Sequence, residues 1–300
     1  MSVQVIYKNK AKSSGLGVIA LFGNEKFQIQ NLRSYFSKIE ASYIEKISKK
    51  KNNTKENIIS FNINDKTTII IISIKKILKG SGVEALGAQL YNFIKKDNIK
   101  NLSIFSESIN TKPGKDFIGR FMHGLKLKSY EFNIYKSKKI KNNLTINLIG
   151  KQTTLSVKNK LKFRALEEGT FFTRDLVSEP GNILHPDEYA KRLIKLKKYG
   201  LKVTVYDQKK LKKLGCNALL GVGQGSIRGS YLVTVEWKGN KSKSKPLAFI
   251  GKGVCFDTGG YSLKPARFME DMTYDMAGSA AVVGLMKNLA LRKAKVKREG

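Results

Sequence analysis

The stretch that decides this chain spans residues 250–265, IGKGVCFDTGGYSLKP, and continues through residues 269–278, MEDMTYDMAG. Two carboxylates, Asp257 and Asp275, stand 18 positions apart in it. Glycines on either side of Asp257 fix the charged groups within a short loop, instead of spreading them along a helix face. Crowded like charges are unfavourable unless an opposite charge offsets them, and a divalent metal ion would do so.

Two lysines accompany these aspartates. Lys252 precedes Asp257 by five residues and could ligate a metal only as the neutral amine, which desolvation and a nearby dication would favour. Lys264 would remain an ammonium and could stabilise an oxyanion that develops on a carbonyl. Each has a simpler alternative. Lys252 could be one solvated surface charge among many, and Lys264 could pair with Glu270 or Asp271.

The position of the loop also suggests a binding site. Residues 247–250 have the pattern of a buried strand, so residues 251–265 would leave its carboxyl end, the edge at which open α/β sheets bind ligands. Three glycines would allow positive φ angles and close backbone approach there: Gly253, Gly259 and Gly260.

Asp275 stands just before a final helix predicted over residues 276–291. Taken alone, an Asp at that place is expected to be the helix N-cap. Asp257 and Asp275 together favour a metal, because hard divalent ions prefer carboxylate oxygens and zinc or manganese also accepts nitrogen. No histidine joins the group.

The rest of the chain alternates strand-like and helix-like segments, which predicts an α/β fold. In residues 1–150, short β-branched runs predict strands at 3–7, 18–22, 67–74, 102–105 and 144–149, and apolar spacing predicts helices at 83–95 and 117–127. Residues 49–55 and 136–143 are polar and are predicted to be loops.

A long helix predicted over residues 158–177 connects this region to a second one, and residues 179–182, Glu-Pro-Gly-Asn, end that helix. We therefore divide the chain into an N-terminal α/β domain, 1–150, a linker helix, 151–180, and a second α/β domain, 181–300. Within the second domain the pattern predicts a helix at 186–196, a strand at 201–206, a helix at 208–214, a glycine-rich turn at 221–225 and a strand at 231–237.

Composition narrows the class of protein. Of 300 residues, 41% are hydrophobic, which is enough for real cores. The net charge of +34 keeps nucleic-acid binding open. We favour a general bias toward lysine, because the lysine runs are dispersed and lack the Arg forks or interleaved aromatics of nucleic-acid readers.

The chain has two cysteines, Cys216 and Cys255, which fits a reducing compartment and argues against a disulfide scaffold. No apolar run of about 18 residues predicts a membrane span, and the first ten residues lack the apolar core of a secretory signal. We expect a cytoplasmic protein without membrane partners.

Four ordered motifs closely resemble the leucyl aminopeptidase (cytosol aminopeptidase) family. Residues 251–265 resemble its metal-binding segment and residues 272–281 its next segment. Residues 173–184, TRDLVSEPGNIL, and 219–226, LLGVGQGS, are similar to two further stretches in the same order. Residues 1–150 resemble the variable, macro-like N-terminal domain of the family more weakly.

The resemblance implies a metal-dependent exopeptidase that releases N-terminal amino acids, with a leucine-like preference, through water activated by two divalent ions, Mn²⁺ or Zn²⁺. Asp257 would bridge both ions, and Lys252 and Asp275 would complete the shell of one. Lys264 would be the catalytic electrophile that contacts the scissile carbonyl. Met272 would line the substrate pocket together with these four residues. Peptides would be the substrates, and the full-length protein is expected to form a homo-hexamer.

The sequence departs from the family pattern in one important respect. The further acidic ligands and the catalytic arginine of the family belong to an Asn-Thr-Asp-Ala-Glu-Gly-Arg-like segment, and the 300 residues stop at Gly300 without it. We therefore expect the catalytic domain to be incomplete and these 300 residues alone to be inactive. Two alternatives to the peptidase are a catalytically incomplete fragment and a nucleic-acid-binding protein on the same fold.

Overall fold

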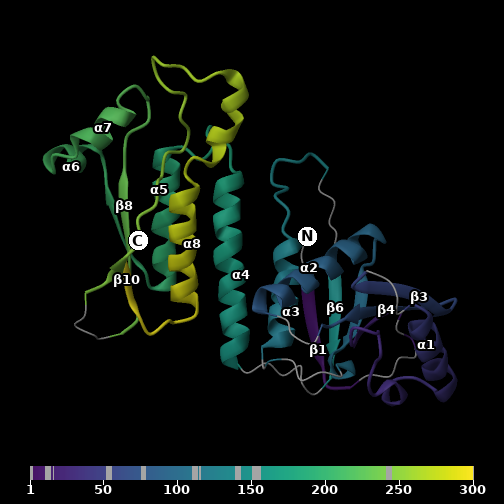
Figure 1. Cartoon of the computed structure of the whole chain (residues 1–300). Coiled ribbons are helices and arrows are strands. Elements are labelled where there is room, and N and C mark those ends of the chain that lie inside the picture. Colours follow the sequence, from purple (N-terminus) through teal and green to yellow (C-terminus); the bar gives the residue numbers. More distant parts are fainter. Residues whose placement is uncertain are drawn as a thin grey trace. The chain divides into compact units, whose positions relative to one another are not determined.

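The computed structural model describes residues 3–10, 15, 17–51, 56–75, 79–109, 114, 116–138, 143–150, 157–240 and 245–299. The chain divides into two compact units, residues 1–163 and 164–300, which Figure 1 shows in purple to teal and in teal to yellow. The dividing point falls within helix α4 (Val157–Ser178). Each unit is described by itself.

The first unit is built on a six-stranded sheet with the strand order β1-β6-β5-β2-β4-β3. All neighbours are parallel except β3 and β4, which are antiparallel. The strands are β1 (Val3–Lys8), β2 (Val18–Gly23), β3 (Ile58–Asn64), β4 (Thr67–Ser73), β5 (Asn101–Phe105) and β6 (Leu144–Ile149).

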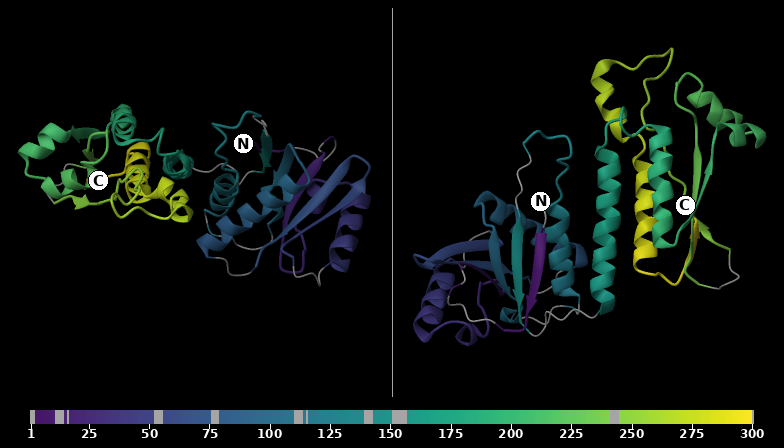
Figure 2. Two further views of the ribbon diagram at one scale, coloured as in Figure 1. Left: turned by 90° about the horizontal axis from the view of Figure 1, so that it is seen from above. Right: turned by 180° about the vertical axis from the view of Figure 1, so that it is seen from behind.

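Helices cover both faces of this sheet. In β2, Ala20 and Phe22 pack with α2 (Gly80–Lys96) and α3 (Phe117–Lys128), whereas the alternating Ile19 and Leu21 pack with α1 (Lys38–Lys50). All four of these side chains are fully buried. Because the central strands are buried on both faces, their sequences are continuous apolar runs. The further views in Figure 2 show helices on both sides of the sheet.

Local signals explain where these helices begin and how closely they pack. Helix α1 starts at a capping box, in which Ser37 accepts from the backbone of Glu40 and the Glu40 side chain accepts from the backbone of Ser37. Helices α2 and α3 approach at glycines. A Cβ on Gly87 would lie 1.9 Å from the carbonyl oxygen of Phe121, and one on Gly124 would lie 1.9 Å from that of Glu84. No side chain fits at either position.

The second unit carries a four-stranded sheet with the order β7-β8-β10-β9, antiparallel between β7, β8 and β10 and parallel between β10 and β9. Its strands are β7 (Lys202–Tyr206), β8 (Leu232–Lys238), β9 (Leu247–Ala248) and β10 (Lys297–Glu299), and its helices after α4 are α5 (Pro186–Ile194), α6 (Gln208–Lys213), α7 (Asn217–Gly223) and α8 (Ala277–Leu291).

Helix α8 supplies the centre of the second core. Ala280 and Met286 are fully buried against residues of α5 and the sheet. Its contact with α4 is close, because a Cβ on Gly169 would meet the carbonyl oxygen of Gly284 at 2.7 Å. The hydroxyl of Thr173 also donates to the carbonyl of Ala280 at 3.0 Å. Glycines therefore allow α8 to pack closely against α4.

The expected α/β class is confirmed, and most predicted elements are present within one or two residues of their expected ends. The sequence pattern did not predict α1, β3, α7 or β10. The turn predicted at residues 221–225 is wrong in its first part, because α7 continues through Gly223. The helix predicted at 186–196 is shorter than expected, because α5 ends at Ile194 and a 3-10 helix follows over Lys195–Tyr199. Two predicted loops fall partly outside the described residues, at 52–55 and 139–142.

Two further expectations concern cysteines and membranes. Cys216 and Cys255 are both free thiols. Among the residues that the structure describes, no helix is both long and apolar enough to cross a bilayer.

Candidate metal centre

The strand that was expected to deliver the decisive loop is short and exposed. β9 comprises only Leu247 and Ala248, with Leu247 51% exposed and Ile250 97% exposed. The prediction of a buried strand over residues 247–250 is therefore wrong for this structure. β9 stands at the end of the strand order and pairs with β10 alone among the described strands, so its apolar side chains have little to pack against.

The loop is nevertheless held in place by the first turn of α8, where the chain returns after an excursion beyond that helix (Figure 1). The backbone amide of Ser279 donates to the carbonyl of Lys252 at 2.8 Å. Gly251 allows the approach, because a Cβ there would lie 2.5 Å from the Cα of Ser279. The Ser279 hydroxyl lies 3.0 Å from the hydroxyl of Tyr189 in α5. Three segments thus fix the backbone beside Lys252.

Lys252 and Asp275 form one charged pair. The Lys252 Nζ lies 2.6 Å from Asp275 Oδ1, with the lysine side chain 59% exposed and the aspartate side chain 16% exposed. The two residues are 23 positions apart, so the fold and not local spacing brings them together. Lys252 is therefore more than a solvated surface charge.

Lys264 and Asp257 form the second pair. Lys264 Nζ lies 2.7 Å from Asp257 Oδ2 and 3.2 Å from the Asp257 carbonyl oxygen. The expected alternative partners of Lys264, Glu270 and Asp271, are not the ones it contacts. The other Asp257 oxygen accepts from the amide of Gly259 at 2.8 Å, at a residue with φ of 92°. Positive φ at Gly259 and Gly260 matches expectation, whereas Gly253 does not adopt it.

The charges around Asp257 connect the two pairs. The hydrogen bond from Lys264 is the main cause that lowers the pKa of the Asp257 carboxyl, and the amide of Gly259 adds to it. The charge of Lys252 acts in the same direction. Asp257 is therefore an anion whose charge both lysines stabilise, as a metal-bridging carboxylate would need to be.

One observation in this group bears directly on metal binding. Oδ2 of Asp275 is buried and has no hydrogen-bond partner. A buried carboxylate oxygen without a partner is unfavourable, and a hard divalent cation is the ligand that suits it. The donors present therefore fit one ion. They are few, however, since no cluster of three or more His, Cys, Asp or Glu side chains occurs among the described residues.

The structure also decides the roles of two neighbouring positions. The residue at the N-cap of α8 is Met276, which makes no side-chain cap, so the expectation that Asp275 caps this helix is wrong. Asp275 instead ends the preceding 3-10 helix, Glu270–Tyr274. Met272 lies within that 3-10 helix and is partly buried. Its carbonyl accepts a hydrogen bond at 3.3 Å from the amide of Asp275, three residues later.

Sequence reasoning missed the support from α5. Tyr189 is 5% exposed, and burial raises the pKa of its phenol to about 12. Tyr189, Leu193 and Leu196 are buried at helical spacing, and that periodicity could have predicted the burial of the tyrosine. Nothing in the sequence predicted its partner, Ser279, which is 90 residues away.

Comparison with known proteins shows the family in whose catalytic domain these residues occur. The model of the cytosol aminopeptidase family catalytic domain matches residues 171–299, which contain all of the charged residues described above. A probable cytosol aminopeptidase of Nitrobacter winogradskyi is 39% identical over 239 residues, 77% of this chain. The chain belongs to the cytosol aminopeptidase family. Other family members match at higher identity over shorter spans, including those of Phytoplasma australiense, 47% over 195 residues, and Brucella suis, 50% over 183 residues.

Solved structures share the fold of this chain. A mutant of tomato leucine aminopeptidase superposes with a TM-score of 0.77 at 21% identity, covering 99% of this chain and 61% of that one. A bottromycin maturation enzyme in complex with Mn superposes with a TM-score of 0.74 at 21% identity, covering 95% of this chain and 58% of that one. At this identity the likeness concerns the fold alone.

The chain is shorter than its relatives in the family. It spans 48%, 40% and 37% of the lengths of the three curated relatives named above.

Proposed function

We propose that the β9–α8 loop is part of the catalytic centre of a metal-dependent aminopeptidase that releases N-terminal amino acids from peptides. One observation carries the proposal. Within the residues that match the family's catalytic domain, the buried and unpartnered Oδ2 of Asp275 stands beside the Lys252 amine, and Lys252 also acts on Asp257. Such a set of oxygens and nitrogen suits a divalent ion.

In this proposal Asp257 would be a ligand shared by two ions, and Lys252 and Asp275 would be ligands of one of them. The Lys252 amine nitrogen lies 2.6 Å from Asp275 Oδ1, so nitrogen and carboxylate donors for one ion would stand side by side. The ions supply Lewis acidity for the attack of water on the scissile carbonyl. The chain holds the ligands in position through the amide of Ser279 on the Lys252 carbonyl.

Lys264 serves as the electrophile. Its side chain is 28% exposed and is held by both the carboxylate and the carbonyl of Asp257. An ammonium fixed in this way requires little reorganisation when negative charge develops on the substrate carbonyl oxygen. Asp257 thus has two tasks, as a metal ligand and as the anchor of the cation beside the reacting bond.

Met272 lines the pocket for the first side chain of the substrate, and we propose a leucine-like preference. An unbranched and flexible thioether adapts to apolar side chains of different shape. The support is that Met272 is partly buried and lies between Lys264 and Asp275 in the sequence. The tomato protein of the same fold is, in addition, a leucine aminopeptidase.

Metal identity, assembly and location complete the proposal. We infer two ions per subunit from family membership, although the donors among the described residues fit one of them. Mn²⁺ or Zn²⁺ is inferred because the donors are oxygen and nitrogen and because one structure of this fold is a complex with Mn. A homo-hexamer in the cytoplasm is proposed on the basis of family membership.

The proposal is tested with the protein at its native length. Hydrolysis of a leucyl anilide should require Mn²⁺ or Zn²⁺, and a chelator should abolish it until metal is restored. A blocked N-terminus on the substrate should prevent cleavage. Turnover that persists after complete metal removal, or cleavage of internal peptide bonds, would exclude this function.

A further inference from the structure

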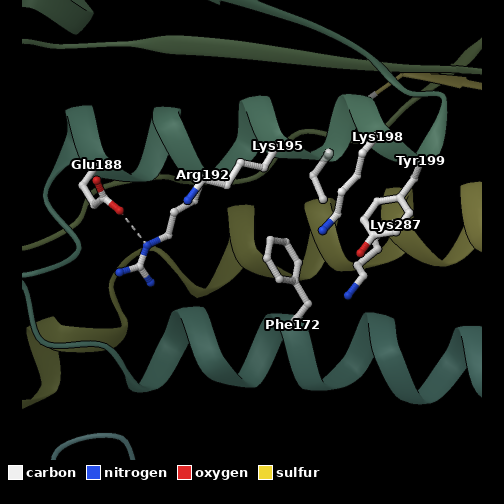
Figure 3. Close-up of a pocket in the computed structure, with 8 residues that line it drawn as sticks. Phe172, Glu188, Arg192, Lys195, Lys198, Tyr199 and Lys287 are labelled. Carbon is white, nitrogen blue, oxygen red and sulfur yellow. Dashed lines mark hydrogen bonds and ion pairs between the residues drawn. The ribbon is translucent and has the colours of Figure 1, made fainter.

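A second concave site in the second unit shares no residue with the candidate metal centre. It is a cavity of about 450 Å³ between α4, α5, the 3-10 helix Lys195–Tyr199 and α8 (Figure 3). Its walls combine two aromatic rings and one leucine with four cationic side chains and one carboxylate: Phe172, Glu188, Arg192, Lys195, Leu196, Lys198, Tyr199 and Lys287. A volume of this order suits a small ligand.

The base of the cavity holds a cation between aromatic rings. The Lys287 ammonium lies 5.1 Å from the centre of the Phe172 ring and 5.5 Å from that of Tyr199. Its side chain is only 13% exposed, and its nearest carboxylate, Glu168 Oε2, is 3.8 Å away. Both rings therefore make cation–π contacts with this ammonium.

Arg192 forms a rigid wall. Its guanidinium binds Glu188 at 3.0 Å and Glu179 at 2.8 Å, and the side chain is 25% exposed. Two carboxylates fix the guanidinium at the end of the cavity that Figure 3 shows next to Glu188. Arg192 therefore contributes a fixed set of donors and no surplus charge.

The surplus charge belongs to Lys195 and Lys198. Both are exposed, and no carboxylate among the described residues lies within ion-pair distance of either ammonium. Four cations and three carboxylates, namely Glu168, Glu179 and Glu188, leave a net charge of +1 around the cavity (4 − 3 = 1). Both lysines come from one short helical stretch, and the Lys198 ammonium lies 5.0 Å from the centre of the Tyr199 ring.

We propose that this cavity binds the phosphate chain of a small polyphosphate ligand, the group that inorganic tripolyphosphate and nucleoside triphosphates share. Lysine ammonium groups on flexible stems can each reach several phosphate oxygens, whereas the fixed guanidinium orients one end of the chain. Because the cations that line the cavity recognise the phosphate chain, a nucleoside without phosphates is not expected to bind. The site is independent of the peptidase centre and of its metal ions.

The test is titration calorimetry of residues 1–300 in magnesium-free buffer at about 0.15 M ionic strength, where diffuse surface charge is screened within about 8 Å. The probes are tripolyphosphate, ATP and adenosine. Because a chain with a net charge of +34 attracts any polyanion, K195A/K198A is compared with K209A/K212A. The control removes the same charge from α6, where Lys209 and Lys212 are exposed and line no part of the cavity.

We expect tripolyphosphate and ATP to bind with one site and similar Kd values, and adenosine not to bind. K195A/K198A should raise Kd by about ten-fold or more, since each lost charge-assisted contact weakens binding, while K209A/K212A should change it by less than about two-fold at this screening. Circular dichroism checks that each variant is folded, and K198A alone provides a milder second test. Equal losses in both double variants, absence of saturable binding, or adenosine binding as tightly as ATP would each overturn the proposal.

Discussion

The ammonium nitrogen of Lys252 lies 2.6 Å from Oδ1 of Asp275, while the other oxygen of the same carboxylate is buried without a partner. One carboxylate thus has one satisfied and one unsatisfied oxygen at the point where the β9–α8 loop meets α8. Because burying an unpaired polar atom costs free energy, this half-satisfied group is the strongest structural reason to place a cation there.

The first prediction concerns the ligands. In the native-length enzyme, D257N and D275N should each lower the content of Mn²⁺ or Zn²⁺, because an amide is a weaker donor for a hard ion than a carboxylate. D271N is the matched control, since Asp271 is exposed in the same segment. Elemental analysis after gel filtration measures occupancy. Equal metal content in D257N, D275N and D271N would remove both aspartates from the site.

The second prediction concerns Lys264. K264A should lower kcat by about 10² to 10³ while metal stays bound, because losing one donor aimed at developing charge typically costs that much. R267A is the control, since Arg267 is exposed three residues away and stacks on Phe268. If kcat of K264A stays within a few-fold of that of R267A, Lys264 serves only to hold Asp257.

The third prediction concerns residues 1–300 by themselves. They should not turn over a leucyl anilide, because the described residues contain no cluster of three or more side chains suited to hold a metal ion. Steady-state assays with added Mn²⁺ or Zn²⁺ check this. Robust turnover that a chelator abolishes would mean that ligands other than Asp257, Asp275 and Lys252 complete the site.

The fourth prediction concerns packing in the first unit. G87A should destabilise that unit by about 1–3 kcal/mol or more, as overpacking usually does, since the new Cβ would lie 1.9 Å from the carbonyl oxygen of Phe121. G17A is the control, because its Cβ would meet only one atom, at 3.9 Å. Hydrogen exchange of α2 and α3 amides reports on this unit, whereas Trp237, the single tryptophan, belongs to the other. Unchanged protection in G87A would contradict the close approach.

The fifth prediction concerns pH. Lys95 Nζ lies 2.7 Å from Glu131 Oε1, and this hydrogen bond is the main cause that lowers the pKa of Glu131 and raises that of Lys95. The lowered Glu131 pKa contributes stability above its unfolded value of about 4.3, which is lost as pH falls through the folded pKa. The raised Lys95 pKa contributes stability that is lost only in strong alkali.

K95M should therefore be less stable than K96M at pH 7, by less than about 1 kcal/mol for such an exposed pair, and the difference should vanish toward pH 3. Lys96 is its exposed neighbour in α2 and carries the same charge. Hydrogen exchange at both pH values measures the difference. A gap that persists undiminished at low pH would show that Lys95 acts through packing.

Part of the fold follows directly from periodicity. The unbroken apolar runs of β2 and β4 are typical of strands buried on both faces, and the spacing in α2 predicted its buried side. α1 escaped prediction because polar residues occupy most of its length and weaken the local pattern. β3, in contrast, alternates apolar and polar residues at Phe61 to Asn64, a pattern that could have predicted it.

The chemistry of the site divides in the same way. The sequence by itself determined that Asp257, Asp275, Lys252 and Lys264 belong to one glycine-rich segment, because residue type and spacing are local properties. Only the tertiary structure decided that Lys264 binds Asp257 instead of Glu270 or Asp271, that Asp275 faces inward instead of capping α8, and that Tyr189 holds Ser279. Partners 7 to 90 residues apart are selected by how helices pack and loops return, and that depends on the whole set of buried contacts and not on any short string of residues.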